Sequence, residues 1–383
     1  MRRFQALDSF RGLFALAVAI YHAHALHTFT ELRFFRNADY FVNFFFVLSG
    51  FVLCHSYSRR LGTWKQVGDF ALTRTFRLYP LHLALLAFAL AIECAKVWGE
   101  HRGMSFGSHS FSGPRSVDEI LPNVLLLQSW WPGFEPLSFN YPAWSISVEY
   151  YLYMLFAVIA VLLRQHMQSA FALVAVAAWT AVVLATNWLT EQALQGLGCF
   201  FSGAVTYRLF RALPTHTLKP RLGSVLEATV LGTIVVILAT INTPHKVLMS
   251  LLFCLAVLVF AFGSGALSTL LCKRFFAWLG TLSYSIYMTH ATLLVLSYIV
   301  LKALGGMVGH PLLIDLPETD SGTIKRYVDT GSALLNNALI VGQLVGVLVV
   351  STLTYRYIEL PGIAAGKRWF KREPALAAQP APL

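Results

Sequence analysis

The stretch LDSFRGLFALAVAIYH at residues 7–22 joins a helix-length apolar run to two polar side chains, Arg11 and His22. Charged groups near the centre of a bilayer cost about 2.5–3.5 kcal/mol on insertion scales, so they persist there mainly for function. The two residues are eleven positions apart, which places them on one helix face and about 16 Å apart along its axis. The stretch therefore predicts a membrane helix with one chemically active face.

The whole chain shares this apolar character. Of its 383 residues, 57% are hydrophobic and only 12% are charged, which excludes disordered chains and most soluble proteins. The formal net charge is +11, but Lys and Arg cluster between apolar runs, as they do in the cytoplasmic loops of membrane proteins. We therefore interpret the charge as a topology signal and expect no nucleic-acid partner. The five cysteines show no C-x-x-C spacing, so we expect no disulfide framework.

Ten segments are long and apolar enough to predict membrane-spanning helices. They cover approximately residues 10–28, 40–57, 78–98, 143–163, 169–188, 194–211, 224–241, 246–263, 277–304 and 335–358. The predicted fold is an all-α polytopic membrane protein with about ten transmembrane helices and with both termini in the cytoplasm, because this places most basic clusters inside. The long connections 99–142 and 305–334 then lie outside. We expect a transmembrane domain over residues 1–362 and a basic, Pro/Ala-rich, disordered cytoplasmic tail over residues 363–383.

A carboxylate follows the start of the predicted span 143–163. Glu149, in the sequence WSISVEY at residues 144–150, lies about 9 Å below the outer end of that span. His22 has a similar predicted depth, so we expect the two side chains to pair. A buried neutral imidazole accepts a proton, and a carboxylate orients it and stabilises the imidazolium. The alternative is a purely structural ion pair.

Two further places carry unusual polar residues. Arg74 and Arg77 are three residues apart before the predicted span 78–98, and their planar guanidinium groups suit phosphates, although topology anchoring and lipid headgroups explain them too. Residues 279–290 form a polar stripe ending at His290, which suits either helix packing or substrate binding. His22 and His24 point to opposite helix faces, so we expect no metal site.

Six segments in a fixed order resemble the acyltransferase type 3 family of integral-membrane O-acyltransferases. They are residues 7–12 (LDSFRG) with His22, 44–51 (FFFVLSGF), 74–80 (RTFRLYP), 144–153 (WSISVEYYLY), 279–290 (LGTLSYSIYMTH) and 355–361 (YRYIELP). The resemblance extends from residue 5 to about residue 362 and implies a similar ten-helix core.

The resemblance implies transfer of an acyl group, usually acetyl, from cytoplasmic acyl-CoA to a hydroxyl of a glycan or related acceptor at the outer face. The site residues that it implies are His22 and Glu149 for catalysis, Arg11, Arg74 and Arg77 for acyl-CoA binding, and Asn43, Ser49, Ser147, Tyr284 and His290 for the acceptor or for structural support. The chain departs from the family pattern at Asn43, where aspartate is common, at Tyr150, where an acidic residue is frequent, and at Leu360, where a basic residue is usual.

We therefore expect a multi-pass O-acyltransferase of a bacterial cytoplasmic membrane. Its expected partners are acyl-CoA as donor substrate, a glycan or lipid-linked glycan acceptor and the bilayer, with no permanently bound cofactor or metal. His22 acts either as general base or as a transient acyl carrier. We expect no added soluble domain, so that the chain acts alone or with a partner. The rival hypothesis is a transporter or lipid flippase that uses the buried His, Glu and Arg as a relay. The acceptor, the acyl length and the oligomeric state are left open by the sequence.

Overall fold

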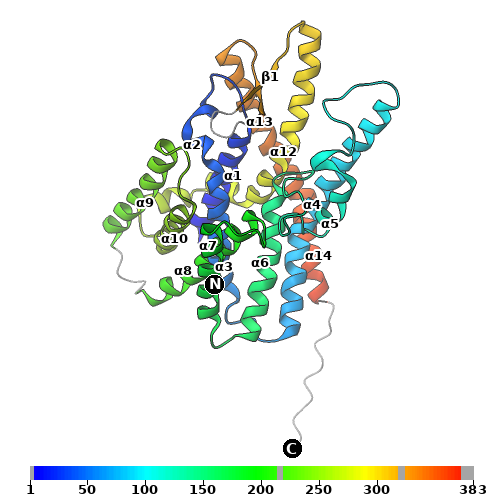
Figure 1. The fold of residues 1–383 in the computed structure, drawn as a ribbon. Coiled ribbons are helices and arrows are strands. Elements are labelled where there is room, and N and C mark those ends of the chain that lie inside the picture. Colours follow the sequence, from blue (N-terminus) through cyan, green and yellow to red (C-terminus); the bar gives the residue numbers. More distant parts are fainter. Residues whose placement is uncertain (1–3, 214–218, 318–323, 372–383) are drawn as a thin grey trace, which may run out of the picture.

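The computed structural model describes residues 4–213, 219–317 and 324–371. Long helices run along one common direction and are joined by short turns, with larger connections at one end (Figure 1). The long helices are α1 Gln5–His22, α3 Phe41–Tyr57, α4 Trp64–Glu100, α6 Ala143–Leu162, α7 Met167–Val183, α8 Glu191–Ala212, α9 Pro220–Thr240, α10 Lys246–Phe262, α12 Arg274–Val308, α13 Ala333–Thr354 and, after the π-helical turn η5 Tyr355–Glu359, α14 Leu360–Lys371. The short ones are α2 Arg33–Arg36, α5 Ile120–Val124 and α11 Ala266–Leu271.

Each of the ten segments predicted to span the membrane falls on one of these helices. Among the described residues, six helical stretches are long and apolar enough to cross a bilayer, and α7 and α10 are apolar helices of 17 residues. Polar side chains within α1 and α8 keep these two helices outside that group. The protein is thus a helical membrane protein, while the count of about ten crossings and the side of each terminus stay predictions.

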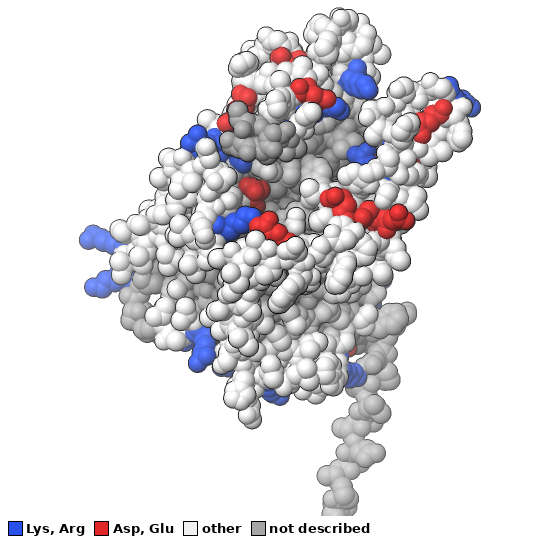
Figure 2. Space-filling model, in the orientation of Figure 1, with Lys and Arg blue, Asp and Glu red and all other residues white. Residues whose placement is uncertain are grey.

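The two ends of the molecule differ. We call the end that carries residues 58–63 and 163–166 the inner end, and the end that carries residues 99–119 and the strands the outer end (Figure 1). The connections 99–142 and 305–334 are predicted to lie on one side of the membrane, and their described residues lie together at the outer end (Figure 1). The visible acidic side chains gather mostly in this outer half, and the inner half of the same face shows mainly Lys and Arg (Figure 2).

One feature departs from the all-α prediction. The connection 305–334 contains an antiparallel hairpin of β1 Leu313–Pro317 and β2 Ile324–Val328, and α12 continues into this connection as far as Val308. Arg326 holds the hairpin with a two-pronged ion pair to Asp315, at 2.8 Å for both contacts, which lowers the pKa of the Asp315 carboxyl. Strands of five residues are too short for the alternation of apolar and polar side chains to distinguish them from a loop in the sequence.

The hairpin is fixed to the segment that follows α1. The amide of Val328 donates to the carbonyl of His24, and the amide of Leu26 donates to the carbonyl of Val328, both at 3.0 Å. These bonds form a parallel bridge between Ala25 and Val328, and both side chains are buried. The outer end of α1 is therefore held by backbone pairing.

The helical part of the chain also continues past residue 362, where the predicted transmembrane domain ends. Helix α14 runs from Leu360 to Lys371 and so crosses the boundary placed after residue 362. Residues 372–383, the greater part of the predicted tail, lie outside the described residues.

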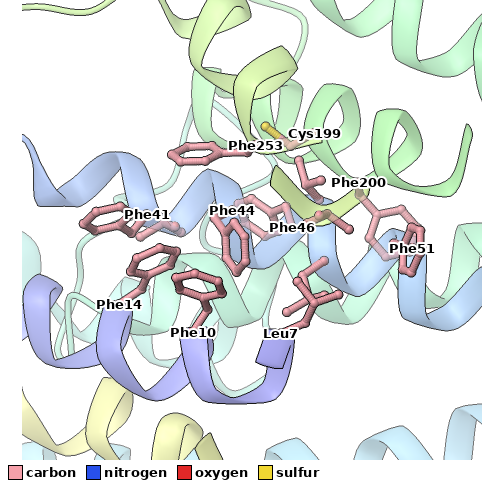
Figure 3. Close-up of a cluster of buried hydrophobic side chains, with 14 of the residues drawn as sticks. Leu7, Phe10, Phe14, Phe41, Phe44, Phe46, Phe51, Cys199, Phe200 and Phe253 are labelled. Atoms are coloured by element: carbon pink, nitrogen blue, oxygen red, sulfur yellow. The ribbon is translucent and has the colours of Figure 1, made fainter. Parts of the chain in front are cut away.

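Aromatic side chains fill the centre of the bundle (Figure 3). Phe10 and Phe14 of α1 meet Phe41 and Phe44 of α3, and the rings of Phe14 and Phe41 stack with centroids 3.9 Å apart. Within a bilayer the hydrophobic effect does not drive helices together, so such packing supplies the association, at about 0.5–1.5 kcal/mol per aromatic pair.

Glycines allow the closest helix contacts. A Cβ on Gly12 of α1 would collide with the backbone of Leu279 and Gly280 in α12, and one on Gly280 would collide with the backbone of Asp8. In the same way Gly203 of α8 lies against the backbone of Val47 in α3. Small residues at these crossings let the helix backbones touch, as is usual in membrane bundles.

We predict that Gly203→Ala destabilises the protein, because the added methyl group would collide with the backbone of Val47. Overpacking of this kind costs about 1–3 kcal/mol. The control is Gly232→Ala in α9, where the added methyl enters open space. Thermal unfolding in one detergent checks this: equal unfolding temperatures for the two variants would contradict the close α3–α8 contact.

Candidate active site

His22 is the last residue of α1 and lies half-buried at the outer part of the bundle. Its ring stacks on that of His290 from α12, with centroids 5.2 Å apart and planes at 23°. The ring of Tyr141, from the segment before α6, lies 4.5 Å away. We call His22, His290 and Tyr141 the outer group.

Within the part of the chain that the structure describes, the outer group holds buried polar atoms without side-chain partners. The hydroxyl of Tyr141 has no hydrogen-bond partner within the described chain, and the ring nitrogens of His290 have no side-chain partner there. His290 is only 2% exposed. Native proteins pair nearly all buried polar groups, so unpaired ones call for a reason such as a ligand or a catalytic role. Asn140 fixes the segment by donating to the carbonyl of Met288 in α12, at 3.3 Å.

Glu149 lies elsewhere, in what we call the inner group, which consists of Arg11, Arg77, Glu149 and Glu359. The carboxylate of Glu149 accepts a hydrogen bond from Ser49 of α3 at 2.5 Å and another from Tyr153 one turn further along α6. Its charge also acts on Arg77. The structure therefore does not bring His22 and Glu149 together, and the predicted pair is wrong in its geometry.

Glu359 completes the inner group. It ends the π-helical turn η5, is 4% exposed and accepts a hydrogen bond from Ser285 of α12 at 3.0 Å. Arg77 and Arg11 lie within electrostatic reach of its carboxylate. Glu359 lies within the segment 355–361 that resembles the family, but it is not among the site residues predicted from the sequence. One signal in the sequence could have found it, namely a carboxylate at the end of an apolar run. The structure adds its place in a π-helical turn, which is frequent at functional sites.

Arg74 is enclosed by rings. Its guanidinium carbon lies 5.3 Å from the ring centre of Tyr57, 5.1 Å from that of Phe70 and 5.1 Å from that of Tyr153. The side chain is 9% exposed. Cation–π contacts of this kind stabilise the fold, by about 2 kcal/mol or more when they are desolvated. This arrangement favours a structural role for Arg74 over a direct contact with phosphate.

A small cavity of about 40 Å³ lies at the inner group. Its walls include Arg11, Glu149, Tyr284 and Tyr287. Tyr287 links the two groups, because its hydroxyl accepts from Ser145 at 2.9 Å while its ring lies 5.9 Å from that of His290. The cavity has room for water only, so a large substrate requires the helices to move apart.

The remaining predicted residues have structural partners or lie apart. Ser147 donates to the carbonyl of Leu126 at 2.6 Å and so fastens the segment after α5 to α6. Tyr284 donates to the carbonyl of Leu78 at 2.6 Å, which ties α12 to α4. Asn43 is buried in α3 and is not among the residues that line the cavity.

Comparison with known proteins identifies the relatives of this chain. The model of a family described as "Acyltransferase domain" matches residues 4–356. The chain is 31% identical over 164 residues to "Acyltransferase MdmB" of Streptomyces mycarofaciens, which covers 40% of this chain and 38% of that protein. It is 41% identical over 100 residues to "Protein 2 in picA locus" of Rhizobium radiobacter, or 25% of this chain and 50% of that protein. The matches thus span half or less of either relative. No solved structure matches the chain.

We predict that Glu149→Gln lowers the unfolding temperature and the activity but leaves the shape of the pH profile unchanged. The arginines of the inner group lose a compensating carboxylate, and a buried polar group left without its partner costs about 1–3 kcal/mol, whereas His22 has other neighbours. The control is Glu191→Gln, which removes an exposed carboxylate paired with Lys246. A shifted pH profile at unchanged stability would show instead that Glu149 acts on His22.

Proposed function

Because this chain belongs to the acyltransferase-domain family and is an acyltransferase of the membrane, we propose that it transfers an acyl group, acetyl by preference, from acyl-CoA at the inner end to an acceptor hydroxyl at the outer end. The proposed acceptor is a cell-surface glycan or a lipid-linked glycan. The proposed location is the cytoplasmic membrane of a bacterium, in keeping with the sources of both relatives.

One observation carries this proposal: the polar residues form two groups at two depths of the same helices. Arg11 and His22 lie about 16 Å apart along α1. On α12, Ser285 binds Glu359 of the inner group, and His290 stacks on His22. A donor with a long flexible arm suits this layout, since its charged end can stay at the inner end of the bundle while its thioester reaches toward the outer group.

The outer group supplies the groups that acyl transfer needs. In the proposed step the imidazole of His22 takes the proton of the acceptor hydroxyl while the hydroxyl oxygen attacks the thioester carbon. The hydroxyl of Tyr141, which lacks a partner in the described chain, then donates a hydrogen bond to the oxyanion. When the tetrahedral intermediate collapses, the thiolate of CoA leaves and receives the proton from the imidazolium.

A second route is open to the same residues. His22 can attack the thioester itself and carry the acyl group to the acceptor in a second step. Rapid quenching with labelled acetyl-CoA in the absence of acceptor distinguishes the routes, because only the carrier route leaves label on the protein.

The proposed activity is tested with purified protein in detergent, labelled acetyl-CoA and a panel of glycans. Release of CoA and the mass of the product are followed together. Transfer of label to a glycan is the expected result; CoA release without a labelled product would indicate hydrolysis and contradict the proposal.

We predict that His22→Ala lowers the rate of transfer by about 10²–10⁴-fold, while the affinity for acetyl-CoA changes little, because the imidazole lies far from the inner end. The matched control is His101→Ala, which removes an exposed histidine just after α4. Rates and donor affinities are measured on the same preparations. Turnover of His22→Ala close to that of the control would refute a chemical role for His22.

We predict that Tyr141→Phe lowers kcat by about 10²–10³-fold, the usual effect of losing one oxyanion donor. The KM for the donor should stay near its original value, because the ring and its packing against His22 remain. Tyr357→Phe, at an exposed tyrosine, serves as control. If kcat of Tyr141→Phe matched that of the control, the oxyanion would have to find its donor elsewhere.

A further inference from the structure

Helices α3 and α8 end side by side at the inner end. Their close contact is set by two glycines, since Gly50 of α3 lies against the backbone of Phe200 and Gly203 of α8 lies against that of Val47. The C-terminal ends of both helices therefore meet, and a pocket of about 460 Å³ opens between them.

Arginine dominates the wall of this pocket. Arg59 and Arg60 follow the end of α3, and Arg208 and Arg211 share one face at the end of α8. Among the described residues no Asp or Glu lines the pocket, and none of these four guanidinium groups forms an ion pair. All four side chains are exposed.

Anchoring of the topology and helix dipoles do not account for this arrangement by themselves. The dipoles of two helix C-termini together amount to about one negative charge. Four arginines carry four positive charges, so about three of these are not offset by the dipoles. Basic residues that serve only as anchors reach outward to the lipid headgroups. Here they surround a hollow whose wall also contains His55 and Tyr207, joined by a hydrogen bond of 3.2 Å.

We propose that this pocket binds phosphate groups, namely those of the nucleotide end of the acyl-CoA donor; this inference rests on the proposed function. Guanidinium groups bind phosphate oxygens in two-pronged geometry. Arg74, the residue that the sequence suggested for this task, is 9% exposed and surrounded by three rings. The pocket instead presents accessible arginines and room for a pyrophosphate.

The pocket lies further toward the inner end than the inner group does. From Ser58 at the pocket to Ser49, α3 rises over nine residues, about 13 Å. Ser49 binds Glu149, which lines the cavity of the inner group together with Arg11. A nucleotide held in the pocket thus directs its flexible arm along α3 toward the inner group.

The test measures binding of coenzyme A to the purified full chain in neutral detergent by calorimetry. Arg208→Gln combined with Arg211→Gln should weaken binding by about 10-fold or more, with kcat at saturating donor nearly unchanged. The control combines Arg164→Gln with Arg274→Gln, which removes two exposed arginines that do not line the pocket. The control should bind coenzyme A as the unmodified protein does.

A second arm uses coenzyme A without its 3′-phosphate. The unmodified protein should bind this compound more weakly than coenzyme A, and the pocket variant should distinguish the two compounds less. The variant with Arg208→Lys and Arg211→Lys keeps the charge and should bind with intermediate affinity, which covers the case in which the glutamine variant fails to fold.

The outcomes separate this inference from the proposed function. Binding of coenzyme A that is equal in the pocket variants, the control and the unmodified protein would overturn the inference alone. Loss of thermal stabilisation by phosphatidylglycerol vesicles in the pocket variants, with coenzyme A affinity unchanged, would assign the pocket to a lipid headgroup. Failure of the unmodified protein to bind coenzyme A would overturn both the proposed donor and this inference.

Discussion

The contact between α1 and α12 is the constraint on which the site depends. Gly12 and Gly280 let the two backbones touch, and His22 and His290 each follow their glycine by ten residues. In two parallel helices that start from one contact, equal spacing gives equal height, so the imidazoles meet. A larger side chain at either glycine would part the helices and with them the two histidines. The two glycines, which lack side chains, thus set the relative height of the two histidines.

Much of the fold follows from the sequence, because the length of an apolar run fixes a membrane helix with little help from its neighbours. The lateral order of the helices does not follow in this way. The predicted depths of Glu149 and His22 agree and so predict that the two side chains meet, yet depth says nothing about which helices are adjacent. α1 lies against α12 and α3, so His22 meets His290, while Glu149 of α6 binds Ser49 of α3. The sequence also indicates the depth of His290, but it does not indicate that His290 lies next to His22.

Arg74 illustrates the same limit for charged residues. Its spacing from Arg77 indicated a phosphate site, which holds only if both side chains are accessible. The rings around Arg74 come from α3, α4 and α6, and no pattern along one segment reveals an enclosure built from three. In the inner group, Glu149 and Glu359 offset the charges of Arg11 and Arg77, whereas no carboxylate among the described residues lines the pocket of arginines between α3 and α8. This contrast separates arginines that are enclosed or paired within the fold from arginines that are exposed at a pocket.

The bridge between the hairpin and the segment after α1 bears on how such proteins diversify. The bonds that join Val328 to His24 and Leu26 use only main-chain atoms, which every residue except proline provides. Substitutions along the exposed faces of the hairpin therefore leave the anchoring of His22 intact. Over evolutionary time the sequence of the outer surface is therefore free to change while His22 keeps its position, and under the proposed function this freedom would allow the acceptor to change.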